Sequence, residues 1–267
     1  MEKARLAGDT PPKLSTHPRR RAARRAVSEE AAHPPREYQH AATDMKTMER
    51  NCILLQIADQ AARRAYKILR TRVLQRLATN QWHSLAVTGT DSGQGKTLTA
   101  INLAIALAQD PNTSVFLVDL DLQRPQVASY LGMRYERGLS DYLVGTAQIE
   151  QIIYSPGVPR LAIIPSAEPL EHSSDFLAAP RMLELVRVLE EESPRHVIVY
   201  DMTPLLMSDD VLTFVPSVDG VLLVVSEGVT GRRALEKSKE FLDEMNVIGV
   251  VLNRSAERND SLSLIHI

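Results

Sequence analysis

The chain has 267 residues, of which 44% are apolar and 24% are charged, as is ordinary for a soluble globular protein. Its single cysteine, Cys52, excludes an internal disulfide and a metal site made of several cysteines, and it suits a reducing compartment. The net charge of −2 gives no overall reason to expect a nucleic-acid partner. Because no apolar run reaches the roughly 18–20 residues of a membrane helix and no signal peptide is visible, we expect a cytoplasmic protein of one or two domains.

Residues 1–50 differ in composition from the rest of the chain. They contain five of the fifteen prolines and have a net charge of +4, whereas the remainder has −6. No helical or strand period persists before about Met48, so this segment cannot bury enough apolar area to offset its ordering entropy. We predict a disordered basic arm. Its cluster Arg19–Arg25 is either a solvated tail or a contact for anionic lipid or an acidic partner, which would allow peripheral membrane association.

An amphipathic helix is predicted in residues 51–83, which form an N-terminal helical extension. From Ile57 to about Ala78 the apolar residues recur mostly at steps of three and four, with arginines on the other face.

From Ser84 onward, short apolar runs alternate with helical patterns. Strands that are apolar on both faces and alternate with helices indicate an α/β fold, a mostly parallel sheet with helices on both faces, in a domain of residues 84–260. Ligands of such sheets bind at the carboxyl ends of the strands. The predicted strands are Ser84–Gly89, Val115–Asp119, Leu161–Pro165, His196–Asp201, Gly220–Ser226 and Ile248–Asn253, and the clearest helices are Lys96–Gln109, Arg181–Glu192 and Arg232–Met245.

A phosphate-binding loop follows the first of these strands. The pattern G-x-x-x-x-G-K-[ST] is matched except at its first position, where Thr90 replaces glycine. Two glycines let the backbone turn its N–H groups toward phosphate oxygens, the lysine reaches the β- and γ-phosphates, and the threonine hydroxyl binds Mg²⁺. The predicted nucleotide-binding residues are Thr90, Asp91, Ser92, Gly93, Gln94, Gly95, Lys96, Thr97 and Leu98.

Carboxylates stand at the ends of two later strands. Asp119 and Asp121 can both face the same cleft, one to hold magnesium and the other to accept a proton, or they can cap a helix and pair with Arg124. Asp201 is placed like a Walker B carboxylate, or it simply caps the strand end. Asp209 and Asp210 either orient a group near the metal or cap the next helix.

The order of these motifs resembles that of the bacterial tyrosine kinases of exopolysaccharide and capsule synthesis. Those kinases are P-loop NTPases related to partition and division-site ATPases, whose extra lysine early in the loop is missing here. The chain is most similar to the exosortase-associated autokinases. The motifs that carry the resemblance are Thr90–Thr97, VFLVDLDLQRP (115–125), Gly138–Leu143, HVIVYDMTPLLMSDD (196–210) and Ile248–Asn253, with Ala65–Arg72 and Ser173–Leu177 for the subgroup.

The resemblance implies transfer of the γ-phosphoryl group of ATP to tyrosine, with ATP and Mg²⁺ as cofactors. Lys96, Asp119 and Asp121 would be catalytic, with one of the two aspartates as base. Thr97, Asp119 and Asp201 would hold the metal, and Asn253 would lie near the adenine. The implied partners are further copies of the chain and a membrane co-polymerase (chain-length determinant) protein, which would recruit it to the inner face of the membrane.

Two departures from the family pattern leave alternatives open. Arg64, Lys67 and Arg70 stand where the family has E-x-x-R-x-x-R, so a ring built on that ion pair is not expected. No tyrosine cluster is present near the end, and residues 262–267 are predicted to be a non-native tail, because they fit no preceding period and can be encoded by a transposon end. The alternative functions are an ATP-dependent dimerising switch without kinase activity and a non-catalytic adaptor.

Overall fold

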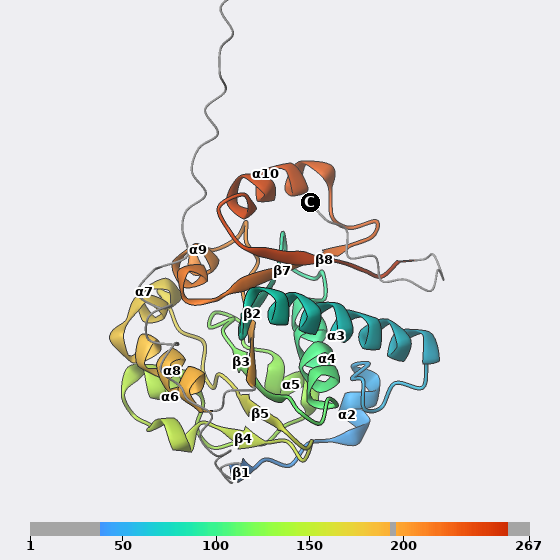
Figure 1. Cartoon of the computed structure of the whole chain (residues 1–267). Coiled ribbons are helices and arrows are strands. Elements are labelled where there is room, and N and C mark those ends of the chain that lie inside the picture. The colour runs from blue at the N-terminus through green and yellow to red at the C-terminus, as the bar shows by residue number, and fades with distance from the viewer. Residues whose placement is uncertain (1–37, 193–195, 256–267) are drawn as a thin grey trace, which may run out of the picture. The chain divides into compact units, whose positions relative to one another are not determined.

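The computed structural model describes residues 38–192 and 196–255, in which eight strands form one sheet (Figure 1). The strand order is β1-β4-β5-β3-β6-β2-β7-β8, and every neighbouring pair is parallel except β4 with β5. The mostly parallel sheet predicted from the sequence is therefore confirmed. The strands are β1 (Gln39–His40), β2 (Ser84–Gly89), β3 (Ser114–Asp119), β4 (Tyr154–Ser155), β5 (Leu161–Ile164), β6 (His196–Asp201), β7 (Gly220–Ser226) and β8 (Val247–Asn253).

Helices cover both faces of the sheet, as predicted (Figure 1). One face packs against α2 (Met45–Arg50), α3 (Gln60–Asn80), α4 (Lys96–Ala108) and α5 (Val127–Leu131). The other packs against α6 (Leu139–Val144), α7 (Ser173–Ala178), α8 (Pro180–Glu191), α9 (Asp210–Phe214) and α10 (Arg232–Leu242). Two short 3₁₀ turns, Ile149–Gln151 and Val215–Ser217, complete the path. In the part of the chain that the structure describes, no helix is long and apolar enough to cross a membrane.

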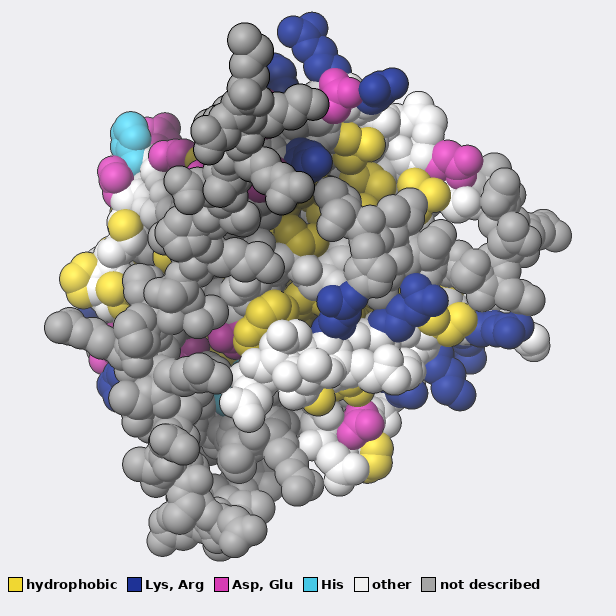
Figure 2. Space-filling model, turned by 45° about the horizontal axis from the view of Figure 1, so that its top comes forward, with side chains coloured by type: hydrophobic (Ala, Val, Ile, Leu, Met, Phe, Trp, Pro, Cys, Tyr) yellow, Lys and Arg dark blue, Asp and Glu magenta, His cyan; other side chains and the backbone are white. Residues whose placement is uncertain are grey.

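Helix α3 is amphipathic, as its sequence period predicts. The Asp59 side chain accepts a hydrogen bond from the backbone N–H of Ala61 and so caps the N-terminus. Leu69, Val73 and Leu77 are buried against the rest of the fold. The opposite side is cationic: in Figure 2, Lys and Arg side chains gather on the right, where Figure 1 places the N-terminal half of α3.

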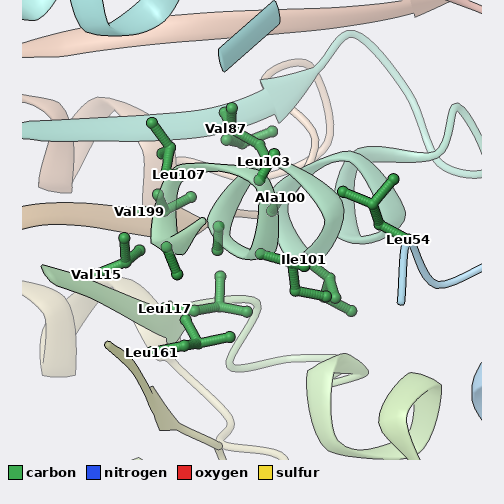
Figure 3. Packing of buried hydrophobic residues seen from close by; sticks show 14 of the residues in the cluster. Leu54, Val87, Ala100, Ile101, Leu103, Leu107, Val115, Leu117, Leu161 and Val199 are labelled. Carbon is green, nitrogen blue, oxygen red and sulfur yellow. The ribbon is translucent and has the colours of Figure 1, made fainter. Parts of the chain in front are cut away.

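Successive side chains along each strand point to opposite faces of the sheet and pack into two separate hydrophobic clusters. On β3, Leu117 points into the cluster on the α4 side, while Phe116 and Val118 point into the opposite cluster. Helix α4 is buried along most of its length because it lies between the sheet and α3, and Figure 3 shows its Ala100, Ile101 and Leu103 directed at strand residues. Burial on both faces explains why the strands are continuous apolar runs in the sequence.

The predicted boundary of the N-terminal arm at residue 50 is wrong. Residues 39–40 form the edge strand β1, and residues 45–50 form α2, whose Met48 is 4% exposed. The following turn is held by α4, because Asn102 accepts a hydrogen bond from the Leu54 N–H (2.7 Å) and donates one to the Cys52 carbonyl (3.0 Å). Few apolar residues are enough here, since the rest of the domain supplies the surface that buries them. Residues 1–37 and 262–267 lie outside the described part.

The helical extension is not a separate layer either. Leu69, Val73 and Leu77 of α3 belong to the same buried cluster as α4 and the β3 side chains. The packed fold therefore begins before residue 84, where the sequence placed the start of its main domain.

We predict that Met48→Ala lowers the free energy of unfolding by about 2–5 kcal/mol, the usual cost of truncating a buried methionine. Met45→Ala on the same helix is the matched control, because Met45 is 64% exposed and its truncation leaves no cavity. Urea unfolding of both variants measures the difference. Equal stability of Met48→Ala and the wild type would contradict the assignment of residues 39–50 to the folded domain.

Candidate nucleotide-binding site

The loop between β2 and α4 has the backbone conformation that a phosphate-binding loop needs. Gly93 and Gly95 have φ of +72° and +88°, in the left-handed region that favours glycine. A Cβ atom on Gly95 would also collide with the side-chain amide of Asn253. Both glycines that the sequence singled out are therefore required by the geometry of the turn.

Backbone N–H groups at the start of α4 point out of the helix end. The first N–H with an acceptor one turn back is that of Thr99, which bonds to the Gly95 carbonyl at 2.9 Å. The N–H groups of Lys96, Thr97 and Leu98 precede it and have no acceptor within the helix. Together with the helix dipole they favour an anion at this position.

The buried Gln94 side chain holds the loop by three hydrogen bonds. Its Nε2 donates to the Thr90 hydroxyl (2.6 Å) and to the Thr230 hydroxyl (2.8 Å), and its Oε1 accepts from the Asp91 N–H (3.1 Å). Gln94 is 1% exposed and Thr90 is fully buried, whereas Asp91 and Ser92 are exposed on the rim of the loop. The loop is therefore shaped before any ligand arrives.

Asn253 at the end of β8 holds the same loop from the other side. Its Nδ2 donates to the Gln94 carbonyl (3.0 Å), and its Oδ1 accepts from the Arg254 N–H (2.9 Å). The family resemblance implies that Asn253 lies near the adenine, and the structure adds this contact with the loop. Thr230 was missed, because a lone threonine in a loop after β7 gives no sequence signal of a contact 136 residues away.

Asp119 and Asp201 face each other across neighbouring strands. They are register partners on β3 and β6, and they are 1% and 0% exposed. Burial raises the pKa of Asp201 to about 7, although the Thr97 hydroxyl and the Lys96 ammonium group nearby lower it. Burial, followed by the charge of Asp201, raises the pKa of Asp119 well above its ordinary value.

The two carboxylate oxygens of Asp119 have different surroundings. Its Oδ2 accepts the N–H groups of Gln126 (3.0 Å) and Val127 (2.9 Å) at the start of α5, which is the helix-capping alternative considered from the sequence. Its Oδ1 is buried and makes no hydrogen bond. Asp119 thus caps α5 and still presents one oxygen to the site.

Asp121 lies at the edge of the site and is half-buried. Burial raises its pKa, and the charge of Lys96 is the largest influence in the opposite direction. Its Oδ1 accepts a hydrogen bond from the backbone N–H of Arg124 (3.1 Å). Asp121 therefore contacts the backbone of Arg124 and stabilises the turn between the two residues.

Asp210 belongs to a separate polar network. Its side chain accepts from Ser173 (2.7 Å) and from Gln123 (3.4 Å), which ties α9 to α7, while the Asp209 side chain caps nothing. Asp210 therefore holds two helices together.

The residues present fit a magnesium ion better than a transition metal. In residues 38–192 and 196–255 no three His, Cys, Asp or Glu side chains gather as a metal cluster. However, Oδ1 of Asp119 and both carboxylate oxygens of Asp201 are buried without a hydrogen-bond partner. Mg²⁺ is usually bound by one or two carboxylates together with substrate phosphates, so orphaned oxygens beside a phosphate loop match its needs.

We predict that Thr230→Val weakens nucleotide binding about tenfold, because it leaves a buried Gln94 donor without its acceptor. Thr230→Ser keeps the hydroxyl and should bind with nearly wild-type affinity. Titration with a fluorescent nucleotide measures both. Equal affinities for the Val and Ser variants would show that the hydroxyl does not shape the loop.

Comparisons with known proteins agree with this geometry. The sequence model of the CobQ/CobB/MinD/ParA nucleotide-binding domain matches residues 85–266. Tyrosine-protein kinase YwqD of Bacillus subtilis is 27% identical over 208 residues, which cover 77% of this chain and 86% of YwqD. Tyrosine-protein kinase CpsD of Streptococcus agalactiae is 27% identical over 215 residues, covering 76% and 89%.

A solved structure is similar over most of the same region. The kinase domain of the Escherichia coli tyrosine kinase Etk superposes with a TM-score of 0.66 at 25% identity, covering 72% of this chain and 76% of that domain. The matched sequence model spans well over half of the residues. The chain therefore belongs to the CobQ/CobB/MinD/ParA nucleotide-binding domain family.

Proposed function

We propose that this chain is a protein-tyrosine kinase that uses ATP and Mg²⁺ and acts in exopolysaccharide polymerisation and export. The observation that carries the proposal is Asp121, a half-buried carboxylate of raised pKa that lies close enough to Lys96 to feel its charge. Phosphoryl transfer to a tyrosine needs a metal-holding carboxylate and a second group that accepts the hydroxyl proton. The kinase names of relatives aligned over 86–89% of their length support the same conclusion.

Each residue of the site has a defined task in this proposal. The N–H groups of the loop and the start of α4 cradle the phosphates, and Lys96 places its ammonium group on the β- and γ-phosphates. Thr97, Asp119 and Asp201 would hold the metal. Mg²⁺, when bound with ATP, neutralises charge that develops on the transferred phosphoryl group.

Asp121 is the proposed base, because Asp119 is fully buried and already caps α5. A raised pKa makes the Asp121 carboxylate a better acceptor for the phenolic proton. The tyrosine oxygen then attacks the γ-phosphorus, the bond to the bridging oxygen breaks, and ADP leaves.

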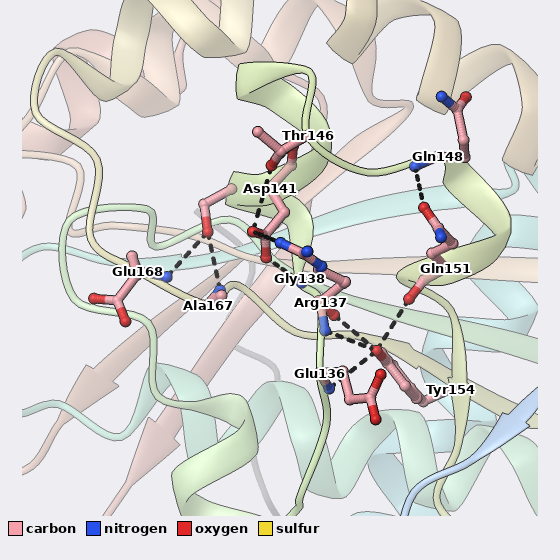
Figure 4. A network of polar contacts seen from close by, with 11 residues as sticks. Glu136, Arg137, Gly138, Asp141, Thr146, Gln148, Gln151, Tyr154, Ala167 and Glu168 are labelled. Atoms are coloured by element: carbon pink, nitrogen blue, oxygen red, sulfur yellow. Dashed lines mark hydrogen bonds and ion pairs between the residues drawn. The ribbon is translucent and has the colours of Figure 1, made fainter.

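The acceptor tyrosine is proposed to come from another polypeptide. All seven tyrosines of the sequence lie in the described ranges, and none is exposed. The Tyr154 hydroxyl is bonded to the backbone of Arg137 (Figure 4). Tyr142 bonds to Glu184, and burial raises its pKa to about 12. These two hydroxyls are held by contacts within the fold.

The proposed partner is a membrane co-polymerase protein, which would recruit the chain to the membrane and activate it. Self-association belongs to the same proposal, although Arg64, Lys67 and Arg70 cannot form the ion pair of the family's ring motif. Membership of the exosortase-associated subgroup also stays a prediction. A partner that supplies an acceptor tyrosine would fit the lack of an exposed tyrosine in this chain.

A regulatory ATPase is the second candidate function. The same lack of an exposed tyrosine favours it, since a switch that hydrolyses ATP needs no acceptor. Phosphotyrosine on an added acceptor distinguishes the two candidates, because the switch would release phosphate to water only.

We predict that the chain with Mg²⁺ and labelled ATP phosphorylates a random copolymer of glutamate and tyrosine, and that Lys96→Met lowers the rate at least about 100-fold by removing the charge on the phosphates. Lys239→Met on the exposed face of α10 is the matched control and should keep full activity. Phosphate release by the wild type without any phosphotyrosine, with or without a co-polymerase segment, would reject the kinase in favour of the switch.

We also predict opposite effects of Asp201→Asn on stability and on ligand response. At pH 8, above the Asp201 pKa of about 7, the variant removes an unpaired buried charge and raises the free energy of unfolding without ligand by about 1–3 kcal/mol. This gain should shrink below pH 7, because a raised pKa means that the wild-type carboxyl is protonated there. The variant should lose the stabilisation that Mg²⁺ adds in the presence of ADP.

Asp210→Asn provides the contrast for this prediction, because Asp210 is equally buried but accepts a hydrogen bond from Ser173. Its substitution should destabilise the protein at pH 8, where Asp201→Asn is expected to stabilise it. Thermal unfolding with and without Mg²⁺–ADP measures both variants. A loss of stability in Asp201→Asn without ligand would contradict the proposed metal site.

A further inference from the structure

The charge of α3 is entirely of one sign. Over 21 residues the helix has Arg63, Arg64, Lys67, Arg70, Arg72 and Arg76 and no Asp or Glu. The other 246 residues keep 25 Lys and Arg against 33 Asp and Glu, a net charge of −8, whereas the whole chain has −2. A cationic helix on an otherwise acidic protein creates a field that orients the molecule toward an anionic surface.

The cationic side chains of the N-terminal half of α3 are turned to the outside. Arg63, Arg64 and Lys67 are exposed, while Leu69 and Val73 point inward to the core. Figure 2 shows this accumulation of Lys and Arg on the right of the view. A groove of about 930 Å³ lies between α3, the turn at Leu54 and Leu55, and the end of α4, and the described residues that line it include four cations and no carboxylate.

Apolar groups lie within the same surface. Leu55, which is 36% exposed, lines the groove together with Ile68 and the buried Leu54. A surface that combines Lys and Arg with partly exposed leucine is typical of segments that rest on the headgroup region of a membrane.

The distribution of these charges decides between the kinds of partner. Two copies of α3 cannot pack face to face, because like charges would meet. Arg63, Arg64 and Lys67 lie one, three and four positions apart, so their side chains share one face of the helix. Three cations beside the partly exposed Leu55 suit lipid, which offers both phosphates and an apolar layer, better than the carboxylates of an acidic protein.

We propose that the outer face of α3 is a docking surface for an anionic lipid membrane. The attraction comes from Arg63, Arg64 and Lys67 in contact with lipid phosphates, and Leu55 adds apolar contact at the level of the headgroups. The surface does not depend on kinase activity.

The experiment compares two triple variants of the full chain. The first variant neutralises the α3 surface by combining Arg63→Gln, Arg64→Gln and Lys67→Gln. The control variant changes three exposed cations of α10, also two arginines and one lysine: Arg232→Gln, Arg233→Gln and Lys237→Gln. Sedimentation with vesicles of phosphatidylcholine and phosphatidylglycerol (3:1), and with phosphatidylcholine alone, measures the partition coefficient at 0.1 M and 0.5 M salt. Nucleotide binding of both variants checks that they are folded.

The expected result is wild-type binding to the anionic vesicles only, strongly reduced at 0.5 M salt. The α3 variant should bind about 100-fold more weakly, since each Lys or Arg near such a surface contributes roughly fivefold. The α10 variant should bind close to the wild type. Equal losses in the two variants, or no wild-type binding to the anionic vesicles, would overturn the proposal. Retention of the wild type by immobilised polyglutamate but not by vesicles would assign the surface to an acidic protein and would also overturn it.

Discussion

Two like charges buried opposite each other are the constraint on which this structure depends. Asp119 and Asp201 end neighbouring central strands, and three of their four carboxylate oxygens have no hydrogen-bond partner. In a medium of low dielectric such a pair is unfavourable. Burial raises the pKa of both groups, and the charge of Asp201 raises that of Asp119 further. A cation bound between the two carboxylates would offset this cost, so the strand ends suit a positively charged ligand.

The phosphate loop is pre-shaped by contacts with distant parts of the chain. Thr230 after β7 and Asn253 at the end of β8 both hold Gln94, so two strands on one side of β2 fix the loop that β2 leads into. Fixing a loop in advance lowers the entropy that ligand binding must cost. It also means that a movement of β7 or β8 would reach the phosphates through two hydrogen bonds.

The sequence predicted those features that depend on residues close together in the chain. Strands buried on both faces, such as β2 and β6, have the predicted bounds, and helix ends differ from prediction by three residues or fewer. The glycines of the loop and the carboxylates at strand ends were found because their spacing is short. Contacts between distant residues, such as Gln94 with Thr230 or the burial of Met48, have no local period and could not be predicted. The capping role of Asp119 was one of two alternatives until α5 was placed.

The residues proposed for catalysis and those proposed for membrane binding lie in different parts of the fold. The proposed reaction needs Lys96, Asp121 and Asp201 at the carboxyl end of the sheet, and it needs a tyrosine that the chain itself does not expose. The cations of α3 lie away from the hydrogen bonds by which Thr230 and Asn253 hold the loop. A surface charge that brings the chain to a membrane would therefore raise the local concentration of a membrane-bound acceptor without altering the site. Tyrosine phosphorylation would then be controlled by where the chain is held as much as by its catalytic residues.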